Sequence, residues 1–268
     1  MAILDNFTIL LYRYNMNACQ LDLFAEKPDS GLLDENNSFG YKEFFNPMEL
    51  QELDDLYELS VQAYFTIINA QMHETFQKNH SKHYLKKIMN AVREAEKRMI
   101  VNDGSLKTKT DNQIALRAAA ENAAFDRGDA LVREILDASH QVGHEIHRLF
   151  GLLRFNPNKD GIWLTRCAPD HYILPVLSQY FLLRFCDDPW AIIDEKRGMA
   201  LVRLKDEDPC FGSLSSFPFL SECKEEQDEW EDLWRSYHQI VNIENRKNPL
   251  LQRQLMPARY WKYLPEKN

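Results

Sequence analysis

The sequence lacks any closely spaced pair of cysteines. Its five cysteines, Cys19, Cys167, Cys186, Cys210 and Cys223, are scattered and odd in number, and none forms a C-x-x-C motif. Zinc ribbons and disulfide scaffolds both depend on cysteines paired at regular spacing. The sequence therefore argues against both classes and predicts reduced thiols in a cytoplasmic protein.

Long apolar runs and the common catalytic signatures are also missing. No run of about 18 apolar residues occurs, so we expect no membrane-spanning helix. The first residues lack the basic region and the cleavage site of a signal peptide, in keeping with a cytoplasmic location. No Gly-rich phosphate loop, G-x-S-x-G motif or paired-carboxylate motif is present. These absences argue against nucleotide hydrolysis and serine-hydrolase chemistry.

Positive charge is in short supply, and it is unevenly distributed. The 268 residues contain 32 Lys and Arg against 41 Asp and Glu, which gives a net charge of −9. Residues 1–60 hold three cations and twelve anions, and residues 206–232 hold one and ten. Residues 82–109 reverse the balance, with eight cations and three anions. Because a polyanion responds to the local field, such a molecule can still present one positive face.

The hydrophobic content of 44% is sufficient for a folded core, and its spacing is mostly helical. We predict an α+β fold, a mainly helical single domain with a small antiparallel sheet, over residues 47–268. Residues 1–46 are predicted to form an N-terminal strand and an extended segment. The expected helices are 48–77, 81–100, 111–122, 130–155, 173–185 and 230–241, and the expected strands are 162–167, 190–193 and 199–204.

The C-terminal stretch concentrates cations and aromatic rings. Residues 245–268 contain six cations and one anion. Arginine, lysine, tyrosine and tryptophan together are the side chains that proteins use on phosphates and stacked bases. The alternative is a tail that folds back and buries Leu255, Tyr260, Trp261 and Leu264 while its charges stay in water.

The segment 140–155 forms a helix with two different stripes. One stripe is apolar, whereas the other carries three imidazoles and one guanidinium. The polar stripe consists of His140, His144, His147, Gly151 and Arg154. Such a stripe suits a metal ligand pair, an acid or base near neutral pH, or a phosphate held by the guanidinium. The alternative is a polar helix face in contact with water, or histidines bonded to buried backbone.

Two further pairs of polar residues lie at the ends of predicted helices and strands. Asp170 and His171 precede the helix that starts near residue 173, where Asp170 fits the role of an N-cap. His171 lies at a strand-to-helix junction, a common place for functional sites. Asp194 and Arg197 bracket the predicted hairpin turn. A local ion pair and a role in a site both explain that pair.

Seven motifs in register carry a resemblance that covers about half of the chain. They are residues 144–155, 168–175, 181–185, 190–197, 233–237, 246–249 and 256–264. Together they resemble an uncharacterised bacterial family assigned to DNA metabolism or DNA repair. The domain of that family also occurs fused to uracil-DNA-glycosylase-like modules, and it is encoded beside a radical-SAM protein resembling spore photoproduct lyase. The resemblance thus implies a DNA-repair context and a radical-SAM partner, but it implies no reaction.

The resemblance also singles out residues. The family pattern falls on His147, Arg148, Arg154, Phe155, Asp170, His171, Arg184, Asp194, Arg197, Arg246, Asn248, Arg259, Tyr260, Trp261 and Lys262. The sequence departs from the family near its start, where members have a Tyr-Asp-Gly-type turn and this chain has Tyr14-Asn-Met-Asn. We therefore do not infer for this chain any function of the family's N-terminal segment.

One peptide in the N-terminal segment matches a known docking pattern. Gln20, Leu21, Asp22, Leu23 and Phe24 fit the pentapeptide by which bacterial repair proteins bind the replication sliding clamp. Leu23 and Phe24 would fill an apolar pocket, beside which Gln20 would form hydrogen bonds. The alternative is that Leu21 and Phe24 are core residues of a first helix.

These features lead to one main hypothesis and two alternatives. The main hypothesis is a DNA-repair protein that binds nucleic acid, docks on the sliding clamp and acts with a radical-SAM protein. The predicted nucleic-acid contacts are Arg148, Arg154, Arg184, Arg197, Arg246, Arg259, Tyr260, Trp261 and Lys262. The predicted catalytic residues are His147 and His171 as acid and base, with Asp170 and Asp194. The motifs specify no cofactor.

The two alternatives belong to other functional classes. One is an adaptor without catalysis that links a repair enzyme to DNA or to the clamp. The other is a metal-dependent hydrolase that uses His144, His147 and His171 with Asp170 or Asp194.

Overall fold

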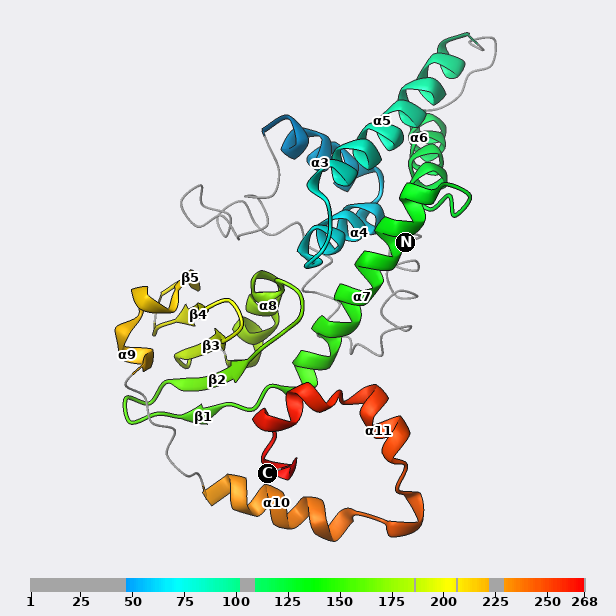
Figure 1. Ribbon diagram of the computed structural model, residues 1–268. Helices are drawn as coiled ribbons and strands as arrows, with labels where there is room; N and C mark the ends of the chain where they lie inside the picture. Colours follow the sequence, from blue (N-terminus) through cyan, green and yellow to red (C-terminus); the bar gives the residue numbers. More distant parts are fainter. Residues whose placement is uncertain (1–46, 102–108, 186, 206, 222–228, 268) are drawn as a thin grey trace. The chain divides into compact units, whose positions relative to one another are not determined.

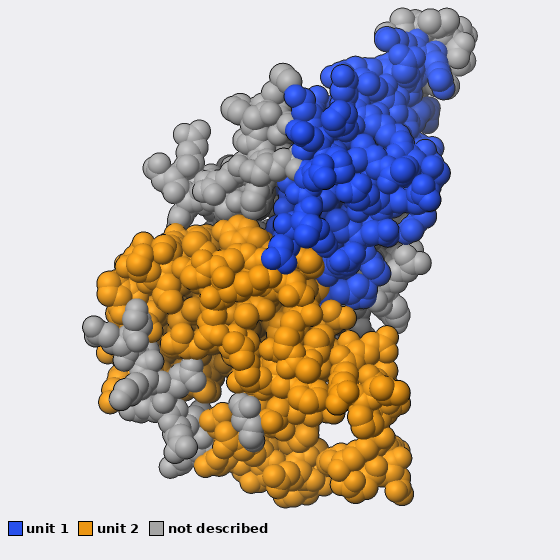
Figure 2. Space-filling model, viewed as in Figure 1, with its two compact units in different colours: residues 1–13, 38–144 blue, residues 14–37, 145–268 orange. Residues whose placement is uncertain are grey.

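The computed structural model describes residues 47–101, 109–185, 187–205, 207–221 and 229–267. These residues form two compact units, one reaching up to His144 and one starting at Glu145 (Figure 2). The predicted N-terminal strand and the clamp-like peptide at residues 20–24 lie outside the described residues.

The first unit is helical. The long apolar stretch 48–77 is divided at Ser60, whose hydroxyl accepts a hydrogen bond from the backbone N–H of Ala63 at 3.3 Å and caps the second helix. The next helix starts at Lys78, three residues before its expected start at Ser81, which is buried and bonded to Gln71. The helices are α3 (Pro47–Leu59), α4 (Val61–Met72), α5 (Lys78–Val101), α6 (Lys109–Ala124) and the first part of α7 (Ala130–Leu152).

Small side chains allow α5 and α6 to pack closely. Ala120 and Ala124 of α6 are fully buried, and the Tyr84 hydroxyl of α5 donates to the carbonyl oxygen of Ala124 at 3.1 Å. Lys87 of α5 pairs with Asp129 at 2.7 Å, just before α7 begins. The alanine-rich sequence of α6 thus serves as a close packing surface in this unit.

The second unit contains a five-stranded sheet in the order β1-β2-β3-β4-β5 (Figure 1). The mainly helical α+β class is confirmed, but the sheet is mixed rather than purely antiparallel. Strands β2 and β3 are parallel because α8 (Leu174–Phe185) provides the crossover between them. The strands are β1 (Asn156–Pro157), β2 (Trp163–Cys167), β3 (Trp190–Asp194), β4 (Met199–Arg203) and β5 (Cys210–Ser213).

The core of the second unit lies on β3 and its neighbours. All five residues of β3 are buried, as expected for a central strand. Its turn into β4 closes at Gly198, whose φ of 61° favours glycine. Leu164, Ile193, Val202 and other apolar side chains form one cluster, against which α9 (Pro218–Ser221) contributes Leu220.

The C-terminal part of the second unit consists of short helices, drawn from orange to red in Figure 1. They are α10 (Glu229–Val241), η3 (Glu244–Arg246), α11 (Pro249–Leu255), η4 (Ala258–Tyr263) and η5 (Pro265–Lys267). The tail folds back in part, because Tyr260 and Leu264 are buried whereas Leu255 is exposed. Within the described residues, no helix has the length and apolar character needed to cross a membrane.

Candidate functional site

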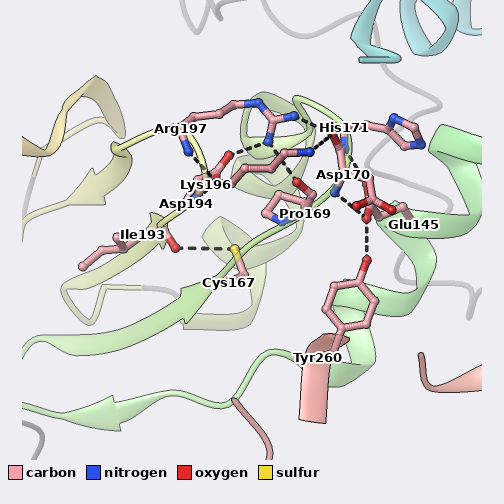
Figure 3. Close-up of polar contacts among 10 residues, drawn as sticks. All are labelled: Glu145, Cys167, Pro169, Asp170, His171, Ile193, Asp194, Lys196, Arg197 and Tyr260. Carbon is pink, nitrogen blue, oxygen red and sulfur yellow. Dashed lines mark hydrogen bonds and ion pairs between the residues drawn. The ribbon is translucent and has the colours of Figure 1, made fainter. Parts of the chain in front are cut away.

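A buried carboxylate joins three segments of the second unit. The side chain of Glu145, on α7, accepts hydrogen bonds from the backbone N–H groups of Asp170 and His171, each at 2.8 Å (Figure 3). The Tyr260 hydroxyl of η4 donates to the same carboxylate. Because a buried charge needs partners, these bonds hold the loop before α8 and the C-terminal segment against α7. We call this group the Glu145 network.

Arg259 extends the Glu145 network toward the surface. Its Nη2 lies 2.8 Å from Asp170 Oδ2 and 3.4 Å from Glu145 Oε1, and its guanidinium lies over the Tyr260 ring at 4.7 Å. Burial and the bond to Glu145 raise the pKa of the Tyr260 hydroxyl, which therefore stays protonated and donates. The network thus contains two carboxylates, one guanidinium and one phenol.

The predicted pair at the hairpin, Asp194 and Arg197, holds the same loop from the other side. Arg197 Nη1 donates to the buried Asp194 Oδ2 at 2.9 Å and to the carbonyl oxygen of Pro169 at 3.0 Å. Its Nη2 donates to the carbonyl oxygen of Asp170 at 2.6 Å (Figure 3). Asp170 lies four residues before α8, so it does not cap that helix as the sequence predicted.

A pocket of about 290 Å³ lies beside β1 and β2, also in the second unit. Three cations far apart in the sequence converge on it: Arg154 from the end of α7, Arg166 from β2 and Lys262 from η4. The residues that line it are Arg154, Asn156, Thr165, Arg166, Glu195, Glu231, Lys262, Tyr263 and Pro265. We call it the β1–β2 pocket.

Carboxylates already accompany the cations of the β1–β2 pocket. Glu195 Oε2 accepts from Lys262 Nζ at 3.1 Å and from the Tyr263 hydroxyl at 2.7 Å, and Arg166 Nη1 lies 4.0 Å from Glu195 Oε1. Burial raises the pKa of Glu195, but these bonds and charges outweigh it and hold that pKa below its ordinary value. Glu195 is therefore ionised at neutral pH.

Arg154 is held in place by its own partners. It donates to Glu266 at 3.1 Å and to the carbonyl oxygen of Gly151 at 2.6 Å. Glu266 in turn accepts from the indole N–H of Trp234 at 3.0 Å, and the Arg154 guanidinium lies 5.7 Å from the Trp234 ring. The guanidinium is thus positioned by a carboxylate and by an aromatic face.

A comparison with protein-family models shows which family the chain belongs to. The model described as a domain of unknown function, DUF4130, matches residues 112–266, more than half of the sequence. The protein belongs to the DUF4130 family. No characterised protein and no solved structure matches the chain. All seven sequence motifs fall inside the DUF4130 region, as do the Glu145 network and the β1–β2 pocket.

The predicted site residues of the DUF4130 region lie at several different places in the structure. Asp170, Asp194, Arg197, Arg259 and Tyr260 meet around the 169–171 loop, whereas Arg154 and Lys262 reach the β1–β2 pocket.

His171 belongs to the 169–171 loop, and the remaining predicted residues lie on α7, α8, η3 and η4. His147 is exposed on α7 beside the partly buried Arg148, and His171 is buried. Arg184 on α8 is exposed, with Nη1 at 3.5 Å from the Tyr180 hydroxyl. Arg246 is exposed in η3. Trp261 is partly buried, and its indole N–H donates to the carbonyl oxygen of Met256 at 2.9 Å.

Sequence reasoning missed Glu145 and part of the pocket lining. Glu145 stands on the apolar stripe of its helix with Val142 and Leu149, and a charge in that position is the signal of a buried, paired carboxylate. Arg166 and Glu195 carried no comparable signal, because their proximity depends on the pairing of β2 with β3.

The histidines of α7 divide between the two units. His140 and His144 belong to the first unit and pack edge to face, with ring centroids 4.3 Å apart, whereas His147 belongs to the second. Among the residues that the structure describes, no group of three or more His, Cys, Asp or Glu side chains is arranged to hold a metal ion.

Proposed function

We propose that this DUF4130 protein binds nucleic acid through the surface around the β1–β2 pocket. One observation carries the proposal: Arg154, Arg166 and Lys262 come from three separate segments and line the same pocket. Guanidinium and ammonium groups of this kind bind phosphate oxygens through charge-assisted hydrogen bonds. The net charge of −9 does not oppose this role, since a phosphate responds to the local field.

Aromatic side chains near the pocket supply the second part of the proposal. Tyr263 lines the pocket, with Lys262 Nζ at 4.5 Å from its ring, and Trp234 is 39% exposed above Arg154. Exposed rings of this type offer a stacking surface for bases. Tyr260 does not enter the proposal as a stacking residue because only 1% of it is exposed. Its interaction with Glu145 instead gives it a role in holding η4.

The DNA-repair context, the sliding-clamp contact and the radical-SAM partner remain part of the proposal on the strength of the sequence resemblance. The clamp contact is proposed for the peptide Gln20 to Phe24. A pull-down of the full chain with purified sliding clamp tests it. Retention that is lost on Phe24→Ala supports the contact, and no retention of the unaltered chain rejects it.

A non-catalytic adaptor is the second candidate, and one observation favours it. Asp170 and Asp194, two of the four predicted catalytic residues, are engaged by Arg259 and Arg197 in contacts that fix a loop. If the protein is an adaptor, His147→Ala changes neither oligonucleotide binding nor repair in a complementation assay. Loss of repair with intact binding would instead assign His147 a catalytic role.

The binding experiment is a titration of fluorescently labelled oligonucleotides, single-stranded and duplex, followed by anisotropy in dilute buffer. We expect Arg166→Ala and Lys262→Ala to weaken binding by about 1 kcal/mol or more each, because each removes a phosphate contact. Lys205→Ala is the matched control, an exposed lysine that follows β4, two strands away from β2. Absence of association with the unaltered protein in dilute buffer would reject the proposed function.

A further inference from the structure

The β1–β2 pocket contains an anion position that the chain itself fills. Lys262 Nζ and the Tyr263 hydroxyl, both from η4, donate to one oxygen of Glu195, and the Arg166 guanidinium of β2 lies 4.0 Å from the other. Two cations and a hydroxyl thus surround a single carboxylate group. Oxygen atoms of a bound phosphate have the same charge and the same need for donors.

The side chain of Glu195 can leave this position without any change in the fold. Its backbone is fixed, since its N–H donates to the carbonyl oxygen of Cys167 at 2.9 Å and the turn that follows is held by Asp194. Its side chain, in contrast, is 36% exposed, and rotation about its own bonds moves the carboxylate into water. Binding of an anion therefore requires a change of the Glu195 rotamer and no movement of the backbone.

The charges favour one kind of incoming anion. Arg166 and Lys262 both lie beside the Glu195 carboxylate, which carries one negative charge. A phosphate monoester carries about −1.5 to −2 at neutral pH, whereas an internal phosphodiester carries a single charge. A monoester therefore brings more negative charge to these two cations than Glu195 does, while a diester brings the same charge.

The size and the remaining lining suit the same ligand. At about 290 Å³, the pocket is at the lower end of the range of small-molecule sites. The lining also includes two polar residues, Asn156 and Thr165. The volume therefore accommodates a phosphate with its sugar rather than a stack of bases.

We infer that the β1–β2 pocket binds a phosphate monoester, the terminal phosphate of a nucleic-acid strand, and that Glu195 occupies this anion position until the ligand displaces it. The inference rests on the proposed function for the strand that carries the phosphate. The binding of the monoester itself depends only on the pocket, so a free nucleoside monophosphate is a second source of the same group.

The test compares three oligonucleotides of one sequence, with a 5′-phosphate, a 3′-phosphate or hydroxyl ends, at constant ionic strength by anisotropy. We expect a phosphorylated end to tighten binding to the unaltered protein by at least threefold. Glu195→Gln keeps the shape of the side chain but removes the competing charge, and we expect it to tighten binding of the phosphorylated strand by a further threefold to fivefold, roughly the size of one exposed ion pair. Arg166→Ala should abolish the preference for the phosphorylated strand.

Glu231→Gln is the matched control. Glu231 also lines the pocket, and its carboxylate pairs with Arg235 at 3.4 Å. The inference predicts that Glu231→Gln leaves the preference for a phosphorylated end unchanged. An equal gain in both variants would show that net charge alone is responsible and would overturn the role of Glu195. Thermal melts of each variant confirm that the fold is retained.

The outcomes separate the inference from the proposed function. Binding of all three oligonucleotides with equal affinity would overturn the inference and leave nucleic-acid binding intact. Absence of oligonucleotide binding would reject the proposed function, and titration of a nucleoside monophosphate by calorimetry then decides the inference alone. Heat of binding that increases in Glu195→Gln supports the pocket as a monoester site, and no heat in either protein overturns it.

Discussion

At the scale of single residues, Glu145 explains more of the second unit than any residue that the sequence singled out. It accepts two backbone N–H groups and the Tyr260 hydroxyl, while Arg259 lies near one oxygen. The family motif around Arg259 and Tyr260 was interpreted as a nucleic-acid contact, but its side chains also hold the C-terminal segment in place. A motif of cations and rings does not by itself distinguish these two uses, because both need charge beside an aromatic face.

The Glu145 network predicts a clear order of stability losses. Glu145→Ala removes the acceptor of four hydrogen bonds in a buried position, so we expect it to lower the free energy of unfolding by about 3 kcal/mol or more. Tyr260→Phe removes one donor to a charged acceptor and one acceptor of the Arg259 guanidinium, and it should cost about 1.5–3 kcal/mol. Urea unfolding of both single variants and of the double variant measures these values. A loss for the double variant equal to the sum of the two would contradict a shared network.

Glu266 makes the attachment of the tail dependent on pH. Burial raises its pKa, but a backbone hydrogen bond, the Trp234 indole and Arg154 outweigh burial and lower that pKa below its ordinary value. Because the pKa is lower in the folded state, this stabilisation is complete above the unfolded value of about 4.3 and is lost as the pH falls through the folded value. Glu266→Gln should therefore destabilise the protein at pH 7 and have a smaller effect at pH 3, which lies below the unfolded value. Unfolding curves at both pH values measure this, and a difference that does not change with pH would contradict it.

At the scale of elements, periodic patterns predicted the long helices and missed the short pieces. Helices α7, α8 and α10 start and end within a few residues of their expected bounds, since each repeats apolar residues over several turns. The two-residue strand β1, the strand β5 and the short helix α11 are too brief to show a period. The mixed sheet could not be predicted either, because the pairing of β2 with β3 depends on how α8 packs and not on the strand sequences.

The α10 to α11 segment carries apolar side chains on its surface. Ile240 is 81% exposed and Leu250 is 80% exposed, whereas Leu264, the residue after η4, is fully buried. We therefore expect Ile240→Ser and Leu250→Ser to change the free energy of unfolding by less than about 0.5 kcal/mol, and Leu264→Ser to lower it by about 3 kcal/mol. Chemical denaturation of the three variants measures the difference. A core-sized loss at Ile240 or Leu250 would show that this surface is covered in solution.

At the scale of the whole molecule, the predicted convergence of distant charged groups is present for some residues and divided for others. Arg154 and Lys262 line one pocket together with Arg166, although more than a hundred residues separate the first two in the sequence. The imidazoles predicted to share one helix stripe with Arg154 are divided, since His140 and His144 belong to the first unit and His147 to the second. The sequence predicted Arg154 and Lys262 as phosphate contacts but not Arg166 or Glu195, because the pocket depends on β1, β2 and η4, which only tertiary packing brings together.

The most direct test of the central claim is the salt dependence of oligonucleotide affinity, measured for the unaltered protein and for Lys262→Ala. Each neutralised phosphate contributes roughly −0.9 to the slope of log K against log salt for a duplex and roughly −0.7 for a single strand. We predict a clearly negative slope for the unaltered protein and a slope shallower by about one contact in the variant. A slope near zero, or the same slope in both proteins, would contradict the binding of nucleic-acid phosphates in the β1–β2 pocket.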